Sequence, residues 1–160
     1  EVLGGVNFEI SAVSRGEIAA GYVSQDFDNY DSIDGFAARG VLEWFPTQMT
    51  TVTLTGARAV EDSGIAFSGG YMSSSAGVRV DHELRRNVIL SANATVARDE
   101  YEGIDREDER VGVSVSGTWL VNRRAGVTVA ASKFEQSSKG ADSGADFDVN
   151  RLTVTLVTQF

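Results

Sequence analysis

The chain has 160 residues, a formal net charge of −9 at pH 7 and no cysteine. The length suits one domain, and the lack of cysteine excludes disulfide bonds and thiolate chemistry. The negative charge argues against nucleic-acid binding. One proline, 17 glycines and many Ser, Thr, Val and Ala residues are typical of strands and turns. No run of about 18 apolar residues exists, which excludes a transmembrane helix.

Apolar and polar residues alternate along nine segments, which is the period of a β-strand with two different faces. Val113 and Val115 point to one side of such a segment, and Ser114 and Ser116 point to the other. At 9 to 15 residues, each segment is long enough to cross a bilayer when tilted. In chain order the predicted strands are Leu3–Ser11, Gly16–Asp26, Gly35–Phe45, Thr50–Val60, Gly70–Leu84, Val88–Tyr101, Glu109–Val121, Ala125–Gln136 and Asp148–Phe160.

The polar side of these segments consists mostly of small neutral residues, and charges are rare in mid-strand. A soluble sandwich would instead carry a charged outer face over a bulky apolar interior. In lipid, strands must close into a barrel to satisfy their backbone hydrogen bonds. We therefore predict an all-β, antiparallel up-and-down transmembrane β-barrel. The alternative is a soluble barrel that binds an apolar ligand, which would need an apolar interior.

Two classes of connection alternate between the predicted strands. Outer-membrane barrels have short periplasmic turns and longer extracellular loops, so we expect the short class in the periplasm and the acidic class outside the cell. The short connections are Ala12–Arg15, Pro46–Met49, Arg85–Asn87 and Asn122–Arg124, and the longer acidic ones are Phe27–Asp34, Glu61–Ser68, Glu102–Asp108 and Ser137–Phe147.

Nine is an odd number of strands, whereas bacterial single-chain barrels have an even number. Either the chain is the C-terminal part of a larger barrel, or Leu3–Ser11 is not a membrane strand and Gly16–Phe160 form eight strands. Val6, Phe8 and Ile10 alternate as well as any other segment, which favours the first alternative. We expect one outer-membrane barrel domain over residues 1–160, incomplete at its N-terminus.

Charged residues within the segments are candidates for the wall of the lumen. A charge on the lipid face at mid-depth costs about 2–4 kcal/mol, so we expect Arg39, Glu43 and Arg79 to face inward. These charges either select solutes or form a network that plugs the barrel. Arg39 and Glu43 are four residues apart on one strand, so they point to the same face and could pair. Arg58 is four residues from Leu54, so it would point to the same outward side. Either a bulge changes the side to which Arg58 points, or Arg58 lies near the rim.

Aromatic residues near strand ends are expected to form girdles at the two membrane interfaces. They are Tyr22, Trp44, Tyr71, Tyr101 and Trp119. A weaker candidate is a Ca²⁺ site in the first long connection, formed by Asp26, Asp28, Asp31 and Asp34. The alternative is a solvated loop, or one bridged by divalent cations to lipopolysaccharide.

No catalytic constellation is visible. Asp81 and His82 are adjacent on a strand, so they point to opposite faces and cannot form one site. The sequence therefore predicts neither an enzyme nor a bound cofactor.

The last predicted strand places Leu152, Val154 and Leu156 on one side and ends at Phe160. This pattern resembles the C-terminal signal that bacterial outer-membrane barrels present to the barrel assembly machinery.

Several short motifs carry a wider resemblance over nearly the whole chain. They are Arg15-Gly16-Glu17, Trp44-Phe45-Pro46-Thr47, Val80-Asp81-His82-Glu83-Leu84, Trp119-Leu120-Val121-Asn122-Arg123 and the stretch from Asn150 to Phe160. The chain resembles the C-terminal part of the type 2 outer-membrane β-barrel porins of proteobacteria, which often accompany exopolysaccharide loci.

The resemblance implies the outer membrane of a Gram-negative bacterium. The partners to expect there are lipid, lipopolysaccharide, the assembly machinery and either an exported polysaccharide or other outer-membrane subunits. Our leading hypothesis is a pore that passes solutes or exported polysaccharide through a polar lumen. The alternative is a structural or adhesive barrel whose acidic extracellular loops bind partners.

Overall fold

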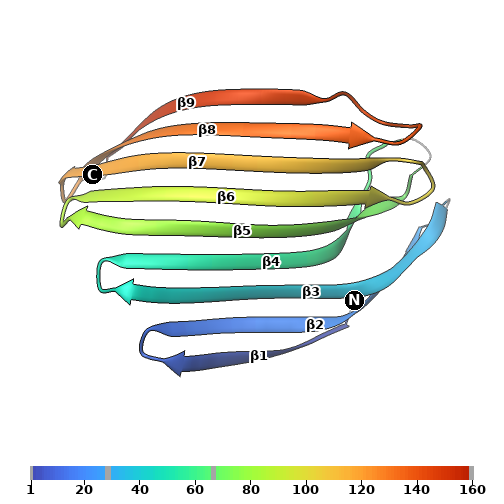
Figure 1. Ribbon diagram of the computed structural model, residues 1–160, viewed down its shortest axis with the longest axis horizontal. Coiled ribbons are helices and arrows are strands. Elements are labelled where there is room, and N and C mark those ends of the chain that lie inside the picture. Colours follow the sequence, from blue (N-terminus) through green and yellow to red (C-terminus); the bar gives the residue numbers. More distant parts are fainter. Residues whose placement is uncertain (1, 28–29, 66–67, 159–160) are drawn as a thin grey trace.

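The structure, a computed structural model, describes residues 2–27, 30–65 and 68–158, and no side chain within 25–34. Within these residues the chain forms nine strands in one antiparallel sheet, each hydrogen-bonded to its neighbours in sequence (Figure 1). The strands are β1 Val2–Ser11, β2 Ser14–Phe27, β3 Tyr30–Thr47, β4 Thr50–Asp62, β5 Gly70–Arg85, β6 Val88–Tyr101, β7 Glu107–Asn122, β8 Ala125–Lys139 and β9 Phe147–Thr158.

Every predicted segment overlaps one strand, so the all-β, antiparallel prediction is confirmed. The first long connection, Phe27–Asp34, was predicted too long, because β2 and β3 continue into it. Ser24 pairs with Asp34 and Gln25 with Ile33. The backbone carries the hydrogen-bond ladder, so polar side chains do not end a strand where the chain can still pair.

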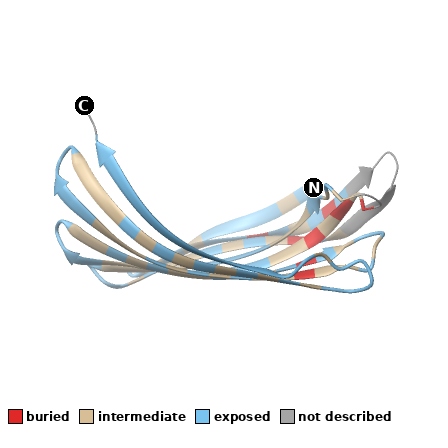
Figure 2. Ribbon diagram, turned by 90° about the horizontal axis from the view of Figure 1, so that it is seen from above, coloured by how far each residue is buried: buried red, intermediate tan, exposed pale blue. Residues whose placement is uncertain are grey.

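The sheet is curved into an open trough (Figure 2). Within the described residues, β1 pairs only with β2, and β9 pairs only with β8. Val2 to Ser11 pair with β2 along their length, so this segment is a strand of the same sheet. That is what the first of the two alternatives for strand number requires.

The pairing register assigns each residue to one of two faces, because directly paired residues point to the same side of a sheet. The apolar face includes the row Phe8, Gly16, Leu42, Leu54, Val78, Ala94, Val113, Lys133 and Asn150. The polar face includes the adjacent row Glu9, Arg15, Glu43, Thr53, Arg79, Asn93, Ser114, Ser132 and Arg151.

The apolar face is uncovered in the described structure. Val6, Val115 and Leu152 are 66%, 59% and 74% exposed. The buried apolar residues are few, and they are Ala19, Val23, Ala37 and Met72. An apolar surface that spans a whole sheet is far larger than a soluble monomer tolerates, whereas lipid would cover it.

The apolar surface forms a diagonal belt across the sheet. Toward the end with the long connections, its last apolar residue on β2 is Tyr22, six residues above the row that contains Val113. On β9 the last apolar residue toward that end is Leu152, which lies two residues closer to the short turns than that row. The boundary therefore moves by about one residue per strand, which corresponds to a strand tilt of about 35–45° against a level membrane surface. Tilted barrel strands have this geometry.

Candidate functional site

The polar face is the candidate functional surface, and one of its rows receives a polar side chain from every strand. Arg15 of β2 donates a hydrogen bond to Glu43 of β3. Arg79 of β5 donates to both carboxylate oxygens of Asp81 at 2.7 and 2.9 Å. Ser91 of β6 also donates to Asp81, at 2.5 Å. The alternation of each strand thus assembles a band of hydroxyl, amide and charged groups across the sheet.

Arg39, Glu43 and Arg79 all lie on this polar face, as their parity predicts. The expected pair between Arg39 and Glu43 is not formed. Arg39 instead contacts Glu17 of β2 at 3.2 Å, and Glu43 contacts Arg15. Residues four apart on one strand are about 13 Å from each other, whereas cross-strand neighbours are about 5 Å apart.

These ion pairs are exposed, so they are weak and exchangeable. Exposed pairs contribute about 0.2–1 kcal/mol each. Arg151 of the edge strand β9 continues the same row and forms no salt bridge within the described part of the chain. The charges of this face are therefore accessible to a solute that moves along it.

A buried network lies on the polar face toward the long connections. Asp99 and Asp108 are directly paired across β6 and β7, and their side chains are 4% and 3% exposed. Arg110 binds Asp99 at 2.6 Å, and Ser73 donates to Asp99 at 2.7 Å. Each of the two facing carboxylates is thus compensated by an arginine and a hydroxyl, because a buried charge needs such partners.

Asp108 is the centre of this network. Arg106 donates to its two oxygens at 3.0 and 2.7 Å, and the Ser138 hydroxyl donates at 2.5 Å. The hydrogen bond to Asp108 raises the pKa of Arg106 further above its usual range. Sequence reasoning missed this network, because it treated Glu102–Asp108 only as an acidic loop. A usable signal was present: Asp108 stands two residues from both arginines, so the three share one side.

Two of the long connections are joined beside the network. Residues 102–106 link β6 to β7, and residues 140–146 link β8 to β9. The Asp105 amide donates to Asp142 Oδ2 at 3.1 Å, and the Ala141 amide donates to Asp105 Oδ2 at 2.9 Å. The Asp142 amide donates to the Asp105 carbonyl at 3.0 Å. We call these three hydrogen bonds the loop clasp.

The predicted aromatic girdle is divided between the two faces. Tyr22, Trp44 and Trp119 lie on the apolar face. Tyr71 and Tyr101 lie on the polar face, where their ring centroids are 4.9 Å apart. The five residues therefore cannot form one outward girdle, because closeness to a strand end does not determine the side to which a residue points.

Arg58 lies on the apolar face, and its strand pairs without a bulge from Thr50 to Asp62. It donates to Ser74 at 2.7 Å and lies 3.9 Å from Glu100. The regular pairing of β4 with β5 excludes the bulge at this residue. Arg58 lies four residues from the end of β4, and Val60 of the same face lies beyond it.

No catalytic group is assembled around His82. Its Nδ1 lies 2.9 Å from the Thr50 hydroxyl, while Asp81 points to the other face and binds Arg79. Among residues 2–27, 30–65 and 68–158, no three His, Cys, Asp or Glu side chains come together as metal ligands.

Some predicted residues fall outside what is described. The side chains of Asp26, Asp28, Asp31 and Asp34 and all of Phe160 lie outside the described residues. The other members of the predicted assembly signal, Leu152, Val154 and Leu156, are exposed on the apolar face of β9. In the described part of the chain, no helix is long and apolar enough to span a membrane, a finding that does not bear on β-barrels.

The family model described as "Putative beta-barrel porin 2" matches residues 1–160. No curated protein and no solved structure shows a significant match to the chain.

Proposed function

The chain belongs to the β-barrel porin 2 family of outer-membrane proteins, and on that premise we propose that it forms the wall of a pore. The polar face would line the lumen, and the apolar face would contact lipid. Solutes, or a polysaccharide on its way out of the cell, would pass along hydroxyl, amide and paired charged groups. No covalent step is part of this proposal.

The observation that carries the proposal is the unbroken polar row from Glu9 to Arg151, opposite an apolar surface that crosses all nine strands as a diagonal belt. Several side chains of this row are small, among them Ser114, Ser132 and Thr53, so they would project little into the lumen. A barrel of eight strands is just filled by its side chains, so an open lumen requires more strands. Nine strands in an open trough are compatible with a wider barrel.

The same assignment orients the protein. Strand connections at one end are tight turns, such as the one between β3 and β4. At the other end are the longer acidic connections with the loop clasp. We infer that the short turns lie in the periplasm and the acidic connections lie outside the cell. Lipopolysaccharide and the barrel assembly machinery are the partners that this arrangement would meet.

Single-channel conductance of the full-length protein in a planar bilayer tests the pore. Steady conductance steps would support it. Arg79→Gln should then shift the ion selectivity toward cations, because it removes a positive charge from the lumen row and leaves Asp81 uncompensated. Silence from a protein shown to be folded and inserted would exclude an open pore.

The loop clasp favours a second candidate, a structural or adhesive barrel. Asp105 and Asp142 hold two acidic connections in one rigid arrangement, and a fixed surface of this kind suits recognition of a partner outside the cell. The two candidates predict different losses: the double variant Asp105→Ala with Asp142→Ala, which removes the two hydrogen bonds of the clasp that use side chains, would abolish partner binding in the adhesive barrel and leave steady-state conductance of a pore largely unchanged.

A further inference from the structure

On β6–β9 the apolar belt ends at two successive tiers of polar side chains on the same face. Toward the long connections, the last apolar residues of these strands are Val96, Val111, Ala131 and Leu152. The next residues of that face, the first polar tier, are Arg98, Glu109, Lys133 and Asn150. The residues after them, the second polar tier, are Glu100, Glu107, Glu135 and Asp148. The order outward from the belt is therefore apolar, then a tier with two cations, then four carboxylates.

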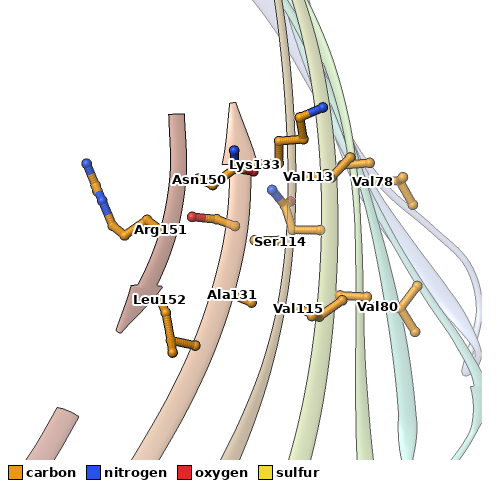
Figure 3. Close-up of a pocket in the computed structure, with 14 residues that line it drawn as sticks. Val78, Val80, Val113, Ser114, Val115, Ala131, Lys133, Asn150, Arg151 and Leu152 are labelled. Atoms are coloured by element: carbon orange, nitrogen blue, oxygen red, sulfur yellow. The ribbon is translucent and has the colours of Figure 1, made fainter. Parts of the chain in front are cut away.

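Figure 3 shows where the belt meets the first polar tier on β8 and β9. Lys133 and Asn150 are directly paired and continue the row of Val113, whereas Ala131 and Leu152 belong to the next row toward the short turns. One row is thus apolar on β7 and polar on β8, because the belt is diagonal. The first polar tier would therefore follow the surface of a membrane and not a single row of the sheet.

A third cation of the same face comes from β4. Arg58 is in the same row as Arg98, and Ser74 of β5 lies between them. Arg58 donates to the Ser74 hydroxyl at 2.7 Å. From Arg58 on β4 to Lys133 on β8 there are four strand spacings, or about 19 Å. The three cations are therefore spread too widely for a ligand with a single phosphate group.

These cations can exchange their present partners. The side chains of Arg58, Arg98 and Lys133 are 42%, 53% and 50% exposed. Arg98 contacts Glu100 at 3.3 Å, and Lys133 contacts Glu135 at 2.5 Å. Exposed ion pairs of this kind contribute little to stability. Charge-assisted hydrogen bonds to a phosphate can therefore replace them.

We propose that the two tiers bind a phosphorylated glycolipid of the outer leaflet, of the lipid A type present in lipopolysaccharide. Its acyl chains lie on the apolar belt, and its two phosphates bind Arg58, Arg98 and Lys133. Its sugar hydroxyls donate hydrogen bonds to the carboxylates of the second polar tier. The proposal rests on the outward placement of the long connections that is part of the proposed function, but it does not require an open lumen.

The second polar tier distinguishes this lipid from other anionic lipids. Ionised carboxylates only accept hydrogen bonds, so they need a headgroup that presents donors beside its phosphates. A sugar headgroup presents several hydroxyls. Cardiolipin also has two phosphates, but only one hydroxyl, so most of the four carboxylates would repel it without a compensating contact. Phosphatidylglycerol has one phosphate and cannot reach cations on separate strands.

The experiment is native mass spectrometry of the full-length protein, refolded without lipopolysaccharide into detergent. Equal amounts of diphosphoryl lipid A, monophosphoryl lipid A and cardiolipin are added. We expect diphosphoryl lipid A to be retained in preference to the other two. Arg98→Gln and Lys133→Gln should each lower its retention about two- to fivefold, the effect of losing one exposed charged contact. Heat-modifiable gel mobility checks that each variant is folded.

A matched control lies next to the first polar tier on the opposite face. Arg151 directly follows Asn150 on β9, so it points to the polar face, where it is exposed. Arg151→Gln removes the same charge and should leave lipid retention unchanged. The double variant Glu100→Ala with Glu135→Ala removes two acceptors for sugar hydroxyls and should reduce the preference for lipid A over cardiolipin.

Equal losses for Arg98→Gln and Arg151→Gln would overturn the proposal, as would cardiolipin retained as well as diphosphoryl lipid A. Equal retention of the monophosphoryl and diphosphoryl forms would also overturn it, because the cations would then not bind two phosphates. A protein that retains lipid A but conducts no ions would refute the pore and leave the lipid site standing. A protein that conducts ions but retains no lipid A would refute the lipid site alone.

Discussion

Val115→Arg tests the assignment of the apolar face most directly. On β7 this face is apolar from Val111 to Val121. Ten residues at about 3.4 Å each, tilted by about 40°, span about 26 Å vertically, close to the apolar band of about 25 Å in outer-membrane barrels. Val115 lies four residues from Val111, and therefore about 10 Å below the membrane surface by the same conversion.

An arginine at this depth on the lipid face should cost about 2–4 kcal/mol of unfolding free energy. Val113→Arg, two residues nearer the surface, should cost about half as much, because its guanidinium can reach the headgroups. Ser114→Arg should cost less than about 1 kcal/mol, because its row on the polar face already holds Arg79 and Arg151.

The assay is urea-dependent unfolding of the full chain from vesicles, followed by tryptophan fluorescence and heat-modifiable gel mobility. The predicted order of destabilisation is Val115→Arg, then Val113→Arg, then Ser114→Arg. Equal losses for Val115→Arg and Ser114→Arg would show that the two faces are not lipid and lumen. A larger loss for Val113→Arg than for Val115→Arg would show that the membrane surface does not lie at Val111 on β7.

Other consequences can be tested in the same preparation. Asp108→Ala should lower the unfolding free energy by about 2–4 kcal/mol, because it leaves the Arg106 guanidinium and the Ser138 hydroxyl without their partner; Asp108→Asn should cost less. Gly140→Ala should loosen the loop clasp, because Gly140 has φ +106° and a Cβ there would lie 2.0 Å from the Asp105 carbonyl oxygen, so faster proteolysis within residues 140–146 is expected with strand stability unchanged. If the network around Asp108 is dispensable, its alanine variant will unfold at the same urea concentration as the parent protein.

The strands could be predicted from the sequence because each carries its own period-two pattern. The predicted and observed starts of β4, β5 and β6 coincide at Thr50, Gly70 and Val88. Parity also placed Arg39 and Arg79 on one face without any knowledge of their neighbours. These properties are local, so a single segment contains the information.

What could not be predicted depends on how strands are placed beside one another. Lys133 shares a face with Val113 and stands directly opposite it, yet one is charged and the other apolar. The diagonal course of the apolar belt accounts for this difference, and the tilt that produces it is a property of the whole sheet. The expected ion pair between Arg39 and Glu43 is not formed for the same reason, because each of the two residues pairs with a residue on a neighbouring strand. The side to which Tyr71 points was readable from its parity with Ser73, but the prediction used its position at a strand end instead.

The strictly sequential order of the strands has a consequence for how such walls change during evolution. Among the residues that the structure describes, each hairpin is hydrogen-bonded only to the hairpins before and after it in the chain. Duplicating or deleting one hairpin would therefore alter the circumference while leaving the register of every other hairpin intact. Barrel diameter grows roughly linearly with strand number. A change in the number of hairpins can therefore alter the width of the channel without altering the side chains that line it, and substitutions can alter those side chains without altering the width.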